Sequence, residues 1–150
     1  MKPGRPDIVS DLDALLEPFR GRVVALLELM RVDGFSPLVW ETWRSPERCC
    51  AIHAAGFGAL RSQHTLRLAC DVLDAELHWD ARPAFWEALH SHALAMGLGR
   101  VHRTVNGRKV LDRPHVQALP GKWDRTLWQL GTDAARAAFV AQLYALETMR

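Results

Sequence analysis

The order of apolar, glycine and proline residues predicts an α+β fold, in which helices pack on a small antiparallel sheet. Long stretches with apolar residues at helical spacing occupy 12–30 and 132–149, near the two ends of the chain. Short runs rich in branched and aromatic residues lie between them, and Asn106-Gly107 is a strong hairpin signal. There is no internal repeat that would indicate a solenoid or an array.

In the first half of the chain, two capping signals set the expected starts of helices. Ser10-Asp11 supplies a capping side chain for the first helix, and Ser45-Pro46 supplies a cap and a proline at the first helical position of the second. The expected elements are a helix over 12–30 that closes near Gly34, a strand over 38–44, a helix from Ser45 to about Gly56 or Gly58, and a buried strand over 66–73.

In the second half, glycine and proline again mark the boundaries. The expected elements are a helix over 80–97, a hairpin over 100–111, a short strand over 114–119 and an alanine-rich helix over 132–149. The length of 150 residues suits one domain, 1–150, with a core large enough to be stable. Residues 1–7 read as a flexible leader at the start of that range.

Composition narrows the function classes. The apolar fraction of 49% and the charged fraction of 24% are ordinary for a soluble protein, and a net charge of +2 with arginines scattered along the sequence argues against nucleic acid as a partner. No run approaches the ~20 apolar residues of a membrane span, so no stable membrane association is expected. Without a secretory signal after Met1, the chain is expected in the cytoplasm at synthesis. We expect a monomer with three reduced cysteines.

Four side chains suggest a metal site. Asp71 lies on the predicted strand over 66–73, on the face opposite its apolar residues, and His64 lies in the loop just before it. His115 begins the last predicted strand, so the three can meet if the two strands pair. Neutral imidazoles with one carboxylate suit zinc. Asp112, three residues before His115, could exchange protons beside the metal. It could equally be a turn residue before a proline, and neither spacing is specific by itself.

Three blocks stand in a familiar order. They are Trp43-Arg44-Ser45-Pro46-Glu47-Arg48, then Ser62-x-His64 through Ala69-x-Asp71, then Asp112-x-Pro114-His115. Together they resemble the LAS-type zinc peptidases, the D-alanyl-D-alanine metallopeptidases and their relatives, which include phage L-alanyl-D-glutamate endopeptidases. The resemblance covers the core motif region, about 38–117, and implies the LAS/hedgehog-like metallopeptidase fold.

The resemblance also implies roles for individual residues. His64, Asp71 and His115 would bind one Zn²⁺, and Asp112 would act as general base and then general acid. Arg44 would hold the substrate or the developing oxyanion, and Ser62 would brace the histidine loop or contact substrate. The implied activity is hydrolysis of peptidoglycan stem peptides at the L-Ala-D-Glu bond, as in an endolysin that acts on the cell wall after release or export.

The chain departs from the family pattern in three places. Trp43 stands where the family has tyrosine, Arg67 stands where it has glycine, and 97–102 lacks the usual tryptophan- and glycine-rich segment. An arginine at a position that needs positive φ would be strained and would bring charge near the metal. One alternative activity is that of a D,D-carboxypeptidase or dipeptidase of the same fold. The departures at Arg67 and 97–102 suggest a second alternative, a catalytically inactive zinc-binding relative that acts as a binding module.

Overall fold

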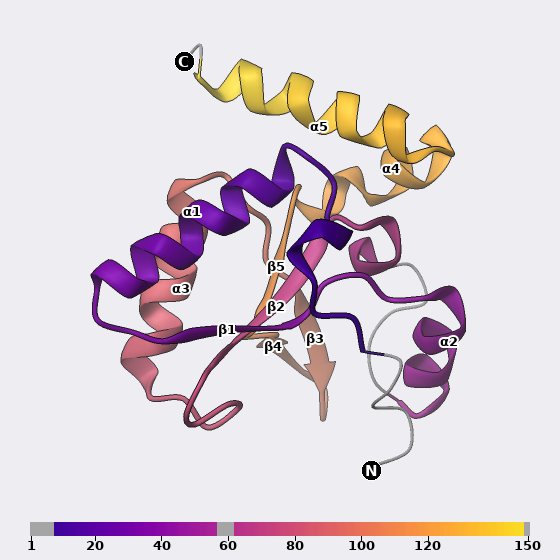
Figure 1. Cartoon of the computed structure of the whole chain (residues 1–150). Coiled ribbons are helices and arrows are strands. Elements are labelled where there is room, and N and C mark those ends of the chain that lie inside the picture. Colours follow the sequence, from indigo (N-terminus) through magenta and orange to yellow (C-terminus); the bar gives the residue numbers. More distant parts are fainter. Residues whose placement is uncertain (1–7, 57–61, 149–150) are drawn as a thin grey trace.

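The computed structural model describes residues 8–56 and 62–148, and the predicted leader over 1–7 lies outside them. Its elements in chain order are η2 (Leu12–Ala14), α1 (Phe19–Val32), β1 (Pro37–Glu41), α2 (Pro46–Ala54), η3 (Gln63–Leu66), β2 (Ala69–Asp74), α3 (Pro83–Ala95), β3 (His102–Val105), β4 (Arg108–Leu111), β5 (His115–Gln117), η4 (Gly121–Trp123), α4 (Asp124–Leu130) and α5 (Asp133–Thr148). The elements labelled η are short 3₁₀ turns. The arrangement is α+β, as the sequence predicts (Figure 1).

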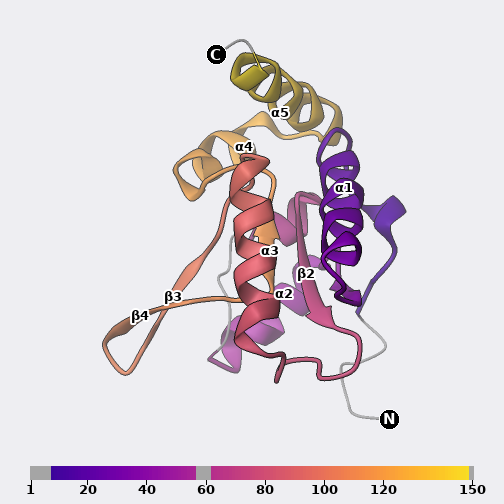
Figure 2. The same cartoon turned by 90° about the vertical axis from the view of Figure 1, so that its left-hand side faces the viewer.

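A three-stranded antiparallel sheet with the order β1-β2-β5 forms the centre of the molecule. Helices α1 and α3 pack side by side over one face of this sheet, whereas α2 lies on the other side (Figures 1 and 2). Apolar side chains from α1, α3 and β2 fill the space between helices and sheet, where burial of apolar area stabilises the fold. The face turned away from α1 and α3 is therefore the one on which polar side chains can gather.

The first helix differs from its prediction. Apolar periodicity from 12 to 30 predicts one helix, but the structure has a short 3₁₀ turn, then Pro18, then α1 from Phe19 to Val32. A proline inside a helix removes a backbone hydrogen bond and clashes with the preceding turn, so the helix restarts after it. The predicted apolar side of α1 is confirmed, because Phe19, Val23 and Met30 are fully buried.

Both predicted strands of the first half are shorter than expected. The strand predicted over 38–44 ends at Glu41, after a register irregularity between Val39 and Glu41. The strand predicted from residue 66 begins at Ala69, because the preceding residues form η3 and Arg67 ends it in the left-handed conformation with φ of 62°. A β-bulge in one strand and a left-handed residue before the other both re-aim the side chains that follow.

The second half follows its prediction more closely. The hairpin turn at Asn106-Gly107 has the positive φ values, 50° and 74°, that this dipeptide favours. Helices α3 and α5 and strand β5 lie where they are predicted, and Met149 at the end of the last predicted helix lies outside the described residues. Helix α2 ends at Ala54, close to the predicted Gly56, and Gly58 also lies outside the described residues.

One short helix, α4, has no counterpart in the prediction. In the described part of the chain, no helix combines the length and the apolar character needed to cross a membrane.

Candidate metal centre

The register of the central sheet places three polar residues side by side. Asp71 on the middle strand β2 pairs with Glu41 on β1 and with His115 on β5. Directly paired residues of antiparallel strands project from the same face. The sheet therefore presents two carboxylates and an imidazole in one row, across strands that lie far apart in sequence.

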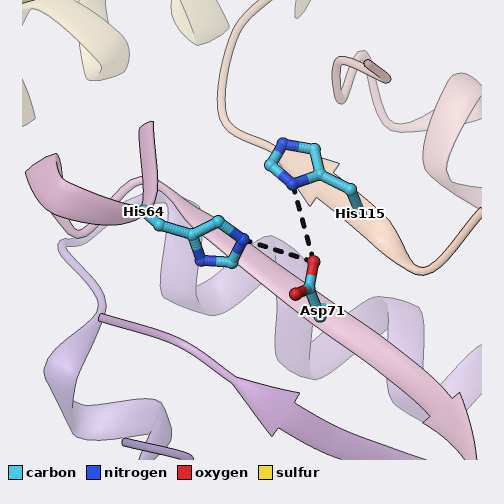
Figure 3. A group of neighbouring side chains, drawn as sticks. All are labelled: His64, Asp71 and His115. Atoms are coloured by element: carbon cyan, nitrogen blue, oxygen red, sulfur yellow. Dashed lines mark hydrogen bonds and ion pairs between the residues drawn. The ribbon is translucent and has the colours of Figure 1, made fainter. Parts of the chain in front are cut away.

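His64 approaches this row from η3. The hydroxyl of Ser62 accepts a hydrogen bond from the His64 N–H at 3.1 Å and caps the turn. The carbonyl of His64 in turn accepts the backbone N–H of Arg44 at 3.1 Å. These two bonds fix the turn, so the imidazole projects over β2 towards Asp71 (Figure 3). Ser62 thus caps the turn that carries His64.

One nitrogen of each candidate imidazole ligand lies close to the same oxygen of Asp71. Asp71 Oδ1 lies 3.2 Å from His64 Nε2 and 3.5 Å from His115 Nδ1, and the three ligand atoms all lie within 4.8 Å of one another. In a tetrahedral zinc site with bonds of 2.0–2.2 Å, neighbouring ligand atoms are about 3.3 Å apart. The two separations from Asp71 Oδ1 match those around one metal ion, whereas the overall spread of 4.8 Å is wider than a bound ion would leave, and all three residues are buried.

The hydrogen bonds behind the two rings determine which nitrogen faces the centre as an acceptor. His64 Nδ1 lies 2.9 Å from the Thr42 carbonyl, which can only accept, so Nδ1 carries the proton. His115 Nε2 lies 2.8 Å from Gln117 Oε1, and that amide is oriented because its Nε2 donates to the Leu119 carbonyl at 2.8 Å. In both neutral rings the nitrogen that faces Asp71 therefore carries a lone pair.

Two lone pairs and a carboxylate oxygen cannot face one another without positive charge between them. Either protons on the two rings or one divalent cation can supply it. Burial acts to raise the pKa of Asp71, but the charges and hydrogen bonds of His64 and His115 outweigh it and hold that pKa well below its usual range. Burial acts to lower the pKa of His115, yet Asp71 raises it above its ordinary value. The cluster has the electrostatics of a cation site.

Arg44 borders this centre and is held by a residue that the sequence did not single out. Its Nε and Nη2 donate to Glu41 Oε1 at 3.2 and 2.7 Å, and Nη2 lies 3.9 Å from Asp71 Oδ2. Glu41 Oε2 accepts from Arg48 Nε at 2.6 Å. Glu41 is only 2% exposed, so this buried carboxylate fixes two guanidinium groups beside the cluster.

Asp112 directly follows β4, and it lies near the cluster but outside it. Its backbone N–H donates to the Val101 carbonyl at 2.8 Å, and its carbonyl accepts the His115 N–H at 3.2 Å, so the turn before β5 is fixed. Burial, and then the charge of Asp71, raise the pKa of Asp112, while His115, Arg103 and His64 act in the opposite direction. A half-buried carboxyl with a raised pKa is suited to proton transfer.

Arg67 has the positive φ that its place in the motif suggests, but its charge is directed elsewhere. Its guanidinium stacks over Trp43 at 4.7 Å, donates to the Ala14 carbonyl at 3.2 Å and lies 3.6 Å from Asp133. The two residues that depart from the family motif are therefore in contact with each other. A cation–π contact and an ion pair offset part of the cost of the left-handed backbone.

Sequence reasoning missed Glu41, Thr42 and Gln117, which orient Arg44, His64 and His115 respectively. For Glu41 a signal existed, since an acid inside a predicted strand is disfavoured and requires a partner. For Gln117 a signal also existed, since it lies two residues from His115 on the same predicted strand, whereas the contact of Thr42 with His64 joins segments far apart in sequence.

No protein-family model matches the chain, and no curated protein matches it. Among solved structures, the chain is similar to the L-Ala D-Glu endopeptidase ChiX of Serratia marcescens, with 22% sequence identity and a TM-score of 0.47. The similarity covers 71% of this chain and 81% of that one. At this identity and TM-score the likeness assigns neither a family nor an activity to this chain.

Proposed function

We propose that this protein is a zinc-dependent peptidase that hydrolyses peptidoglycan stem peptides at the L-Ala-D-Glu bond. The convergence of His64, Asp71 and His115 carries the proposal, because two imidazoles and one carboxylate form a ligand set of catalytic zinc that leaves a fourth position open. The substrate class draws on the resemblance of the three sequence blocks to the LAS-type peptidases. Aspartate rather than glutamate at position 112 favours the endopeptidase branch.

The side chains around the cluster have distinct roles in this proposal. When bound, zinc would polarise the scissile carbonyl and acidify a water molecule. Asp112 accepts the proton of the attacking water and returns it to the leaving amine, for which its raised pKa is suited. Arg44, fixed by Glu41, donates hydrogen bonds to the negative charge that develops on the substrate oxygen. The chain reaches the wall after release or export.

Metal analysis and digestion of purified stem peptides test the proposal together. We expect about one zinc per chain and new amino termini at D-glutamate in mass spectra of the digest. The Asp112→Asn variant keeps the metal and loses turnover by roughly 10²–10⁴-fold, the usual contribution of a general acid–base group. Asp80→Asn, at an exposed aspartate, serves as the matched control and retains activity.

Each alternative gives its own result in this experiment. Release of free D-alanine from the peptides identifies a D,D-carboxypeptidase instead. Stoichiometric zinc without any cleavage identifies an inactive binding module. A protein that takes up no zinc contradicts the metal site itself.

A further inference from the structure

The β3–β4 hairpin stands out from the body of the protein beside the candidate metal centre. Figure 2 shows it projecting away from the helices, and residues 102–110 are all exposed. It forms its own two-stranded sheet, apart from the central one. Its second strand leads directly through Asp112 to His115. A ligand bound to the hairpin would therefore lie next to the segment that carries Asp112 and His115.

The segment that contains the hairpin is strongly positive. The segment from Gly97 to Leu111 contains Arg100, Arg103, Arg108 and Lys109 and no carboxylate, so its formal charge is +4 against +2 for the whole protein. The remainder of the chain thus has a net charge of −2. Within residues 8–56 and 62–148, none of these four cations forms an ion pair. Three arginines and one lysine thus lie within one short segment that carries no opposite charge.

The register divides the hairpin into two faces. Arg103 pairs with Val110 and Val105 pairs with Arg108, so these four residues share one face, which we name the arginine face. The N–H of Asp112 bonds to the Val101 carbonyl, which continues the same ladder by one pair. By alternation, Asp112 lies at the foot of the arginine face, and the Arg103 charge opposes the rise in its pKa.

The opposite face of the hairpin provides a comparison. It carries the pairs His102 with Leu111 and Thr104 with Lys109. Lys109 has the same charge and the same exposure as the two arginines, but it projects away from Asp112. Position relative to the candidate base is therefore the difference between the two faces.

We propose that the arginine face binds the acidic part of the peptide substrate on the leaving-amine side of the scissile bond. The proposal rests on the peptidase function proposed for this site, in which Asp112 delivers the proton to that amine. In an L-Ala-D-Glu substrate the leaving amine belongs to glutamate, so carboxylates lie on this side. Arginine forks match carboxylates in geometry, and Val105 and Val110 offer apolar area between them for the peptide's aliphatic groups.

Binding of an uncleavable ligand tests the proposal without turnover. The probe is the product peptide that begins at D-glutamate, titrated into the purified zinc-loaded protein in a calorimeter at low salt. An exposed charge pair contributes about threefold in affinity, so the Arg103→Ala/Arg108→Ala variant raises Kd about tenfold. Each single arginine variant raises Kd about threefold, whereas Lys109→Ala, the matched single-charge control, leaves it nearly unchanged.

A second ligand separates charge recognition from a loss of folding. For the same peptide with its carboxylates amidated, wild type and double variant bind with the same Kd. Equal weakening by Lys109→Ala and Arg103→Ala overturns the proposal, because the effect is then one of net charge. Failure of the peptidase proposal is seen separately, as a wild-type protein that cleaves no stem peptide. If that protein still binds the acidic product through the two arginines, only the binding proposal stands.

Discussion

Neutralising Glu41 tests whether the buried carboxylate supports the architecture of the centre. The variant is Glu41→Gln, which keeps the shape and removes the charge. Glu41 and Arg44 lie three residues apart, 2.7 Å from oxygen to nitrogen, with side chains only 3% and 11% exposed. Removing one partner of a buried pair costs about 3–5 kcal/mol, because the other charge is left without compensation. Here two guanidinium groups lose their carboxylate, so we expect at least 3 kcal/mol, a lower bound from the same rule.

The chain contains a matched control. Glu28 and Arg31 have the same sequence separation and the same 2.7 Å contact, but their side chains are 65% and 50% exposed. Exposed pairs contribute at most about 1 kcal/mol, so Glu28→Gln lowers the free energy of unfolding by less than that. Urea unfolding with a metal chelator present, at pH 7, measures both variants. Equal losses in the two variants, within about 0.5 kcal/mol, would mean that burial of the Glu41 pair adds nothing to stability.

Three further predictions concern the residues around the centre. Gln117→Leu removes the acceptor that orients His115, so zinc affinity falls roughly 10–100-fold. Gln129→Leu, on the exposed side of α4, is the control and leaves zinc affinity unchanged. The pKa of His115 is raised, and a metal ion and a proton compete for the same nitrogen. Zinc affinity therefore weakens as the pH falls through that raised pKa, and a zinc affinity that is constant with pH would contradict this prediction. Arg67 has a φ of 62°, which alanine tolerates poorly and glycine tolerates well. In chemical denaturation, the free energy of unfolding of Arg67→Gly is therefore about 1 kcal/mol higher than that of Arg67→Ala.

The sequence could predict several elements of the fold, because each has a local signal. The hairpin turn, the proline-capped α2 and the apolar side of α1 follow from capping, turn chemistry and periodicity. The break at Pro18 was within reach of the same rules, but apolar spacing on both sides of the proline concealed it. Helix α4 has only Leu127 buried, so it has no periodicity to reveal it.

Most of the support around the ligands could not be predicted, because it depends on pairing between distant segments. Glu41 reaches Asp71 only through the register of β1 on β2 and the irregularity before it. Gln117 is the exception, because it lies two residues from His115 on the same side of β5, and its own side-chain amide is oriented by donating to the Leu119 carbonyl. Local sequence specifies neither the strand order nor the register on which these contacts depend.

The most direct test of the account is a crystal structure of the zinc-loaded protein, with anomalous diffraction recorded on both sides of the zinc absorption edge. We predict one anomalous peak within roughly 2.0–2.2 Å of His64 Nε2, His115 Nδ1 and an Asp71 oxygen, with Asp112 outside bonding distance. A peak elsewhere, or either imidazole turned away from Asp71 in the loaded protein, would contradict it.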